Sequence, residues 1–141
     1  MKILFPTDGS EHSVAALRGL LSHLEWFAEP PQIALINVHP QLPYARAVAC
    51  VGKEAATRYY ADESSAALAP ASAVLDERGI RYEHVAKIGE PAHEIVNYAA
   101  EWKADLIAMG RHGHSHIESM LMGSVAQKVL ATVTIPVLLV P

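Results

Sequence analysis

The chain has 141 residues, of which 51% are hydrophobic and 18% charged, with a formal net charge of −4 at pH 7. This length suits one domain that buries about two-thirds of the surface of its unfolded chain. No apolar run approaches the ~20 residues of a membrane-spanning helix, and the scattered Lys and Arg residues form no basic stripe for nucleic acid. We therefore expect a single globular domain over residues 1–141, with no membrane span and no nucleic-acid partner.

A single cysteine, Cys50, excludes an internal disulfide. The N-terminal sequence leads directly into Pro6-Thr7-Asp8, and its apolar run is too short for a signal peptide. These features predict a cytoplasmic protein. We expect Cys50 to be a bystander, because nothing in the sequence marks it as an activated thiol.

The first third of the chain predicts a strand, a turn, a helix and a second strand. Residues 2–6 form a short apolar run, and the turn residues 7–11 lead into a helix that Pro30-Pro31 ends. Residues 33–38 are apolar on both faces, which predicts a central strand. The helix should cover the sheet with one apolar face, formed by Val14, Leu17, Leu21, Leu24 and Ala28.

The middle of the chain predicts a loop, a long helix and an outer strand. Residues 41–52 show no clear period, and residues 53–78 predict a helix that Pro70 kinks or splits. Gly79 is suited to the position just after the C-terminus of that helix. Residues 81–87 alternate polar and apolar side chains, as expected of a strand at or near a sheet edge.

The last third continues the alternation. A short helix begins at Pro91, which is favoured at the first helical position, and ends near Trp102. Residues 104–109 predict a buried parallel strand, and residues 125–132 predict a helix. The final strand, residues 136–140, begins with proline and so is expected at an edge.

This order of five strands separated by helix-length spacers predicts a parallel sheet with right-handed crossovers, hence a three-layer α/β sandwich. The apolar edge Val137 to Val140 is a liability unless another chain covers it. We therefore expect a homodimer that pairs through this strand.

Three glycines and a serine stand between the strand at 104–109 and the next helix, with the spacing Gly110-x2-Gly113-x9-Gly123-Ser124. We call residues 110–124 the glycine loop. Glycines let backbone N–H groups crowd around an anion, and Ser124, expected at the helix N-cap, stands where negative charge is favoured. The pattern favours a phosphate site, although the same glycines also suit a tight turn and a helix start alone. It matches neither the P-loop nor the dinucleotide-binding fingerprint.

Four stretches resemble the universal stress protein family: residues 3–10, Gly89-Glu90-Pro91, residues 104–110 and residues 136–140. The spacing of the glycine loop is similar to the signature of the ATP-binding branch of that family, which the non-binding branch lacks. The resemblance covers nearly the whole chain. It implies a Rossmann-like sheet in the order 3-2-1-4-5 and a dimer through the last strand.

The resemblance also implies which residues contact ATP. The adenosine side would be lined by Pro6, Thr7 and Asp8, with Asp8 near the ribose or a divalent ion, and by the backbone of Val38 at adenine. One departure is Ala126, where some relatives carry a hydroxyl residue, so one possible phosphate donor is missing. Nucleoside and phosphates would be enclosed by Met109, Gly110, Arg111, His112, Gly113, His114, Gly123, Ser124 and Val125.

The glycine loop offers no P-loop lysine, so Arg111, a divalent metal and the helix N-terminus must share the phosphate charge. Mg²⁺ is the expected ion, with Asp8 as its protein ligand, because Mg²⁺ bridges phosphates while keeping waters and one or two carboxylates. A zinc site at His112, His114 and His116 is the weaker reading, since no Cys or carboxylate is placed to complete its shell.

The first functional interpretation is an ATP-binding dimer whose shape or affinity for an unknown protein partner changes with nucleotide state in a stress response. The second is a slow ATPase or a nucleotidyl or phosphoryl transferase, for which the sequence singles out no catalytic residue beyond candidates His112, Glu118 and Asp8. A third is a dimerising regulator for which nucleotide is incidental. The sequence does not separate ATP from another adenine nucleotide such as cyclic AMP.

Overall fold

The computed structural model describes residues 1–41, 52–113 and 122–141. Within these residues five parallel strands form one sheet in the order β3-β2-β1-β4-β5. This order confirms the predicted topology. The strands are β1 (Lys2–Pro6), β2 (Gln32–His39), β3 (Tyr82–Ile88), β4 (Leu106–Gly110) and β5 (Val137–Val140).

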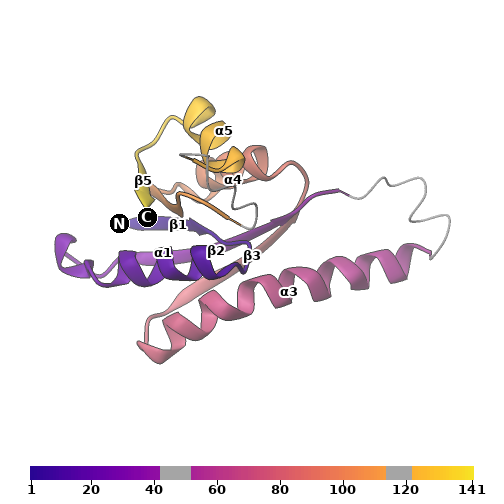
Figure 1. Cartoon of the computed structure of the whole chain (residues 1–141), viewed down its shortest axis with the longest axis horizontal. Coiled ribbons are helices and arrows are strands. Elements are labelled where there is room, and N and C mark those ends of the chain that lie inside the picture. Colours follow the sequence, from indigo (N-terminus) through magenta and orange to yellow (C-terminus); the bar gives the residue numbers. More distant parts are fainter. Residues whose placement is uncertain (42–51, 114–121) are drawn as a thin grey trace.

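Helices cover both faces of the sheet, which gives three layers (Figure 1). One face carries α1 and α3 packed on Phe5 and Leu35, and the other carries α4 and α5 packed on Leu4 and Ile36. Neighbouring strand residues point to opposite faces and both faces are covered, which explains the unbroken apolar runs. The helices are α1 (Glu11–Leu21), the short 3-10 helix η1 (Leu24–Trp26), α3 (Lys53–Glu77), α4 (Pro91–Trp102) and α5 (Ser124–Thr132).

The first helix is shorter than the sequence predicts. It was expected to reach Pro30, but α1 ends at Leu21 and the chain continues as η1. The carbonyl of Gly19 accepts hydrogen bonds from Ser22 Oγ at 2.8 Å and lies 2.9 Å from His23 Nδ1. Side chains that bond a nearby carbonyl compete with the helical ladder, so the helix ends here.

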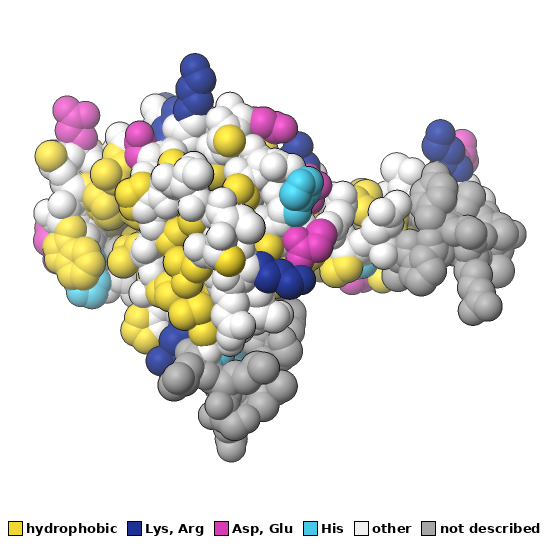
Figure 2. Space-filling view, turned by 90° about the horizontal axis from the view of Figure 1, so that it is seen from above, with side chains coloured by type: hydrophobic (Ala, Val, Ile, Leu, Met, Phe, Trp, Pro, Cys, Tyr) yellow, Lys and Arg dark blue, Asp and Glu magenta, His cyan; other side chains and the backbone are white. Residues whose placement is uncertain are grey.

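The long helix α3 is continuous through Pro70, so the predicted split does not occur. Pro70 is exposed, whereas Leu68, Ala71 and Leu75 around it are buried against the sheet. This packing offsets the hydrogen bond that proline cannot make. The N-terminal turns of α3 project beyond the body of the sheet (Figures 1 and 2).

The other predicted elements are all present, with ends that lie within two residues of the predicted ones. Glu90 is the N-cap of α4 and Pro91 its first residue, while Gly79 follows α3 with a φ of 65°. β2 lies inside the sheet, and β3 and β5 form its two edges. Among the described residues, no helix has the length and apolar character needed to span a membrane.

Candidate functional site

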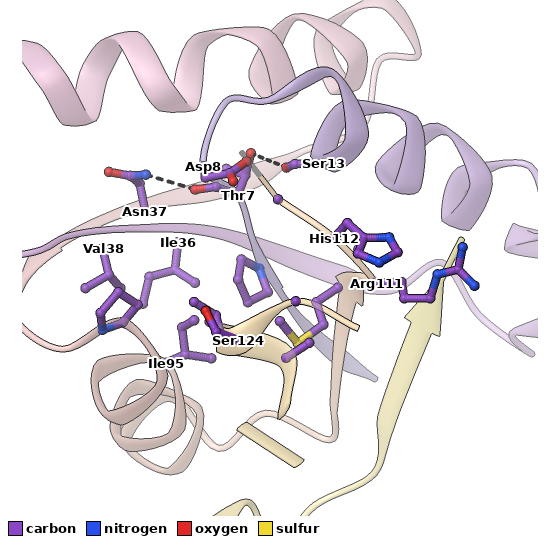
Figure 3. Close-up of a pocket in the computed structure, with 18 of the residues that line it drawn as sticks. Thr7, Asp8, Ser13, Ile36, Asn37, Val38, Ile95, Arg111, His112 and Ser124 are labelled. Carbon is purple, nitrogen blue, oxygen red and sulfur yellow. Dashed lines mark hydrogen bonds between the residues drawn. The ribbon is translucent and has the colours of Figure 1, made fainter. Parts of the chain in front are cut away.

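A cavity of about 250 Å³ lies at the carboxyl ends of β1, β2 and β4 (Figure 3). The direction of winding reverses between β1 and β4, since β2 and β3 lie on one side of this pair and β5 on the other. Loops leave such a switch point in opposite directions and open a crevice, which is where open α/β sheets bind ligands.

The structure brings together all of the predicted site residues that it describes. His114 lies outside the described residues, as do His116, Glu118 and Cys50. The remaining predicted residues come from three distant segments of the chain. They line the cavity as Pro6, Thr7, Asp8, Val38, Met109, Gly110, Arg111, His112, Gly113, Gly123, Ser124 and Val125.

The start of α5 presents free backbone donors to this cavity. The N-cap is Gly123, with no side-chain cap, and Ser124 is the first helical residue, which corrects the prediction that Ser124 is the cap. The first bond of the helical ladder runs from Gln127 N to Gly123 O at 3.0 Å. Within the described part of the chain, the amides of Ser124, Val125 and Ala126 have no hydrogen-bond partner. These donors and the helix dipole favour an anion.

Close contacts beside these donors leave no room for a side chain at Gly113 and little room for one at Gly123. A Cβ built on Gly113 would overlap the Asp8 carboxylate, with Oδ2 the nearest atom. A Cβ built on Gly123 would lie 3.3 Å from Arg111 O and 3.6 Å from His112 Cα. The missing side chains therefore let the two ends of the glycine loop and Asp8 converge on one space.

Arg111 differs from its predicted role at the phosphates. Its backbone N donates to Val140 O at 3.0 Å, so this amide belongs to the sheet and not to the cavity. Figure 3 shows its guanidinium pointing away from Ser124. In this conformation, the negative charge of a bound anion must therefore be balanced by backbone donors and any bound cation more than by the Arg111 side chain.

A hydrogen-bonded turn holds Thr7 and Asp8 at the cavity. Asp8 Oδ1 accepts from Ser10 N at 3.0 Å and from Ser10 Oγ at 2.6 Å. Thr7 and Ser13 are nearly buried, at 5% and 4% exposure, and their hydroxyl oxygens lie 2.7 Å apart. Buried hydroxyls need such partners, so the turn is held in one geometry.

Sequence reasoning missed several lining residues. Ser13, Pro91 and Ile95 come from helices whose approach to the cavity only the packing shows. Asn37 carried a usable signal, since it is a polar residue within an apolar strand. The missed residues are Ser13, Ile36, Asn37, Pro40, Pro91, Ile95 and Ala126.

The carboxylate of Asp8 is the acidic side chain that lines the cavity among the described residues. Those residues contain no group of three or more His, Cys, Asp or Glu side chains placed to hold a metal ion. A cation that takes most of its ligands from phosphate and water needs only one such carboxylate, and Mg²⁺ is of this kind.

An ion pair joins the start of α4 to the middle of α5, and both helices line the cavity. Lys128 Nζ lies 2.9 Å from Glu90 Oε1, while Glu90 Oε2 accepts from His93 N at 2.8 Å. The hydrogen bond from Lys128 and then that from His93 N lower the pKa of the Glu90 carboxyl below its ordinary value. Glu90 therefore caps α4 and holds it to α5 in its charged form.

Together these features define a Rossmann-like α/β protein with a cavity at its topological switch point. The sequence model of the universal stress protein family matches residues 1–141. The chain belongs to this family.

Relatives agree with this assignment. Universal stress protein MJ0531 of Methanocaldococcus jannaschii is 34% identical over 140 residues, covering 99% of this chain and 81% of the relative. The solved structure of MJ0577 from the same organism superposes with a TM-score of 0.77 at 28% identity, covering 99% of this chain and 94% of that one. A universal stress protein of Archaeoglobus fulgidus, solved in complex with dAMP, has a TM-score of 0.66 at 22% identity over 100% of this chain and 98% of its own, which shows the fold alone.

Proposed function

We propose that this chain binds ATP with Mg²⁺ at the carboxyl end of its sheet and acts as a cytoplasmic, homodimeric, nucleotide-dependent regulator in a stress response. The observation that carries the proposal is the uncapped start of α5. Three free amides there face a glycine-lined cavity, which is the arrangement that binds phosphate in other α/β proteins.

The adenine part of the proposal draws support from relatives. Universal stress proteins have been solved with cAMP, with dAMP and, from Arabidopsis thaliana, with AMP. The cavity lining includes the apolar side chains of Ile36, Val38 and Ile95, which suit a base, and the start of α5, whose free amides suit phosphate. The spacing of the glycine loop supports ATP among these nucleotides.

Asp8 supports the choice of Mg²⁺. Its Oδ1 is held by Ser10, and its Oδ2 faces Gly113, which also lines the cavity. We assign Asp8 as the protein ligand of a Mg²⁺ ion that also binds the phosphates, where the ion offsets their negative charge.

The dimer is proposed through β5. This strand is an edge of the sheet, and all of its residues, Val137 to Val140, are apolar and half-buried. Hydrophobic side chains gather on the face that carries α5 (Figure 2). The other edge, β3, bears Glu83, His84 and Lys87, which protect it from pairing. An unprotected apolar edge therefore favours a second copy at β5.

The experiment that tests the nucleotide is mass spectrometry of material released by denaturing freshly purified protein, followed by calorimetric titration of the apo chain. ATP, ADP, AMP and cAMP are titrated with Mg²⁺ and with EDTA. Tightest binding of ATP with Mg²⁺ supports the proposal. Preference for AMP or cAMP corrects the ligand, recovered ADP with repeated turnover favours the ATPase, and no binding overturns the proposal.

A further inference from the structure

The carboxyl end of β2 holds a polar side chain to which the proposed function gives no role. Asn37 is only 6% exposed, and its Nδ2 donates to the backbone carbonyl of Thr7 at 2.9 Å (Figure 3). A buried amide costs free energy unless it is hydrogen-bonded, and the neighbours of Asn37 in the strand, Ile36 and Val38, are apolar. The bond therefore needs an explanation.

This bond lies where the β1–β2 ladder would place its next rung. Thr7 N donates to Ile36 O at 2.9 Å, and in a regular parallel ladder the next rung would join Val38 N to Thr7 O. The Thr7 carbonyl instead accepts Asn37 Nδ2. Within residues 1–41, 52–113 and 122–141, Val38 N has no hydrogen-bond partner.

The free backbone groups of Val38 face the cavity. Gly89 N donates to His39 O at 3.0 Å, so the backbone of His39 points toward β3. Backbone groups of the neighbouring residue Val38 point the opposite way, toward the end of β1, where Val38 lines the cavity. The N–H and C=O of Val38 lie on the same side of β2, and no described residue forms a hydrogen bond with either group.

We propose that Asn37 is a positioning residue for base recognition. Its side-chain amide occupies the Thr7 carbonyl and so keeps the Val38 N–H open to a ring nitrogen of the bound base. Adenine fits this edge, because its N1 acceptor stands beside its N6 amino donor, and the Val38 N–H and C=O offer the complementary pair. The inference rests on the proposed function for its ligand, whereas the Asn37 geometry is tested without one.

The first test is amide hydrogen exchange by NMR on the apo full-length chain. In Asn37→Leu the Thr7 carbonyl loses its partner, so Val38 N–H should close onto it and exchange about tenfold more slowly. Asn37→Ala provides a second variant if leucine prevents folding. Mere structural damage would speed exchange across β2, so unchanged or faster Val38 exchange overturns the inference.

A matched control is Ser72→Ala, which removes another buried side-chain donor to a backbone carbonyl, Leu68 O at 3.0 Å, away from the cavity. This variant should leave Val38 exchange unchanged. A slowing of similar size in Ser72→Ala would mean that Val38 responds to any loss of buried polarity, which contradicts the specific role of Asn37.

The second test compares ATP with 1-deaza-ATP, which lacks the N1 acceptor. The wild-type chain should bind 1-deaza-ATP about tenfold more weakly than ATP. Asn37→Leu should bind the two nucleotides equally, each about as weakly as the wild-type chain binds 1-deaza-ATP. Equal discrimination by the two proteins overturns the inference. If wild-type protein binds neither nucleotide, the proposed function fails, and the exchange experiment alone decides the role of Asn37.

Discussion

Arg111 N donates a 3.0 Å hydrogen bond to Val140 O, which joins the start of the glycine loop to the last residue of β5. The proposed nucleotide site and the proposed dimer edge therefore share a backbone contact. A displacement of the backbone at Arg111 would therefore strain its bond to the edge strand.

The dimer edge is tested by Leu139→Pro. Ile107 N donates to Pro136 O and Arg111 N to Val140 O, so alternate residues of β5 face β4 and the N–H of Leu139 points outward. Proline deletes that outward donor without removing a bond to β4. We expect Leu139→Pro to sediment as a monomer at concentrations where the wild-type chain is a dimer.

The control for this change is Leu139→Ala, which shortens the side chain and keeps the N–H. It should remain dimeric, with a lower midpoint of thermal unfolding because Leu139 packs on the core under α4 and α5. A monomeric wild-type chain, or a monomer in both variants, would show that the backbone edge is not the interface.

Gly113→Val should abolish nucleotide binding while leaving the fold intact. A Cβ at Gly113 overlaps the Asp8 carboxylate, so the side chain must displace Asp8 or the loop from the cavity. We expect the dissociation constant for ATP to rise by about 100-fold or more, which corresponds to ~2.7 kcal/mol, with a change of only a few degrees in the unfolding midpoint. Calorimetry and thermal unfolding measure the two effects.

Gly79→Asn is the matched control for the glycine change. Gly79 has a φ of 65°, which asparagine tolerates, and a Cβ built there would have no neighbouring atom within 4 Å. Nucleotide affinity should equal that of the wild-type chain. A nucleotide affinity equal to that of the wild-type chain in Gly113→Val would show that the glycine loop is not part of the nucleotide site.

Asp8→Asn should remove the dependence of ATP affinity on Mg²⁺. The amide keeps an oxygen for Ser10 N, so the turn survives, but it loses the charge that a hard cation prefers. Titrations in Mg²⁺ and in EDTA should then give the same affinity. The control is Asp105→Asn, which alters another carboxylate that accepts a backbone N–H. This variant should retain the dependence of ATP affinity on Mg²⁺. Loss of that dependence in Asp105→Asn would point to a general charge effect.

The Glu90 to Lys128 pair predicts a pH-dependent contribution to stability. Because the hydrogen bond from Lys128 lowers the folded pKa of Glu90, the charged form is favoured in the folded state. Its contribution is complete above about pH 4.5 and is lost as the pH falls through the lowered pKa. The pair is exposed, so we expect Glu90→Gln to cost no more than about 1 kcal/mol at pH 7.

Urea unfolding of Glu90→Gln and wild type at pH 7 and near pH 3 measures this effect. The difference in free energy of unfolding should become smaller at the lower pH, where Glu90 begins to take up a proton. Glu25→Gln, which alters an exposed glutamate of η1, provides a control with little difference at either pH. A difference for Glu90→Gln that is undiminished at low pH would assign the effect to packing.

Much of the fold could be read from local pattern. The apolar run at Ile33 to Val38 is continuous because β2 is covered on both faces, and the alternation from Arg81 to Lys87 reflects an edge strand. The helix start at Pro91 was predictable because proline has no N–H to lose there. Predictions failed where side chains compete with the backbone, as Ser22 does at the end of α1.

By itself, the sequence determined the alternation of strands and helices and the position of the glycine loop, because hydrophobic period and glycine spacing are properties of short stretches. Its resemblance to the universal stress protein family supplied the strand order and most residues of the cavity. Only the tertiary structure decided which backbone groups remain free. Asn37 meets Thr7 across 30 residues of chain, and Arg111 N meets Val140 O across the β4–β5 edge. Hydrogen bonds between strands depend on partners far away in sequence, so no local pattern shows which donors they leave for a ligand.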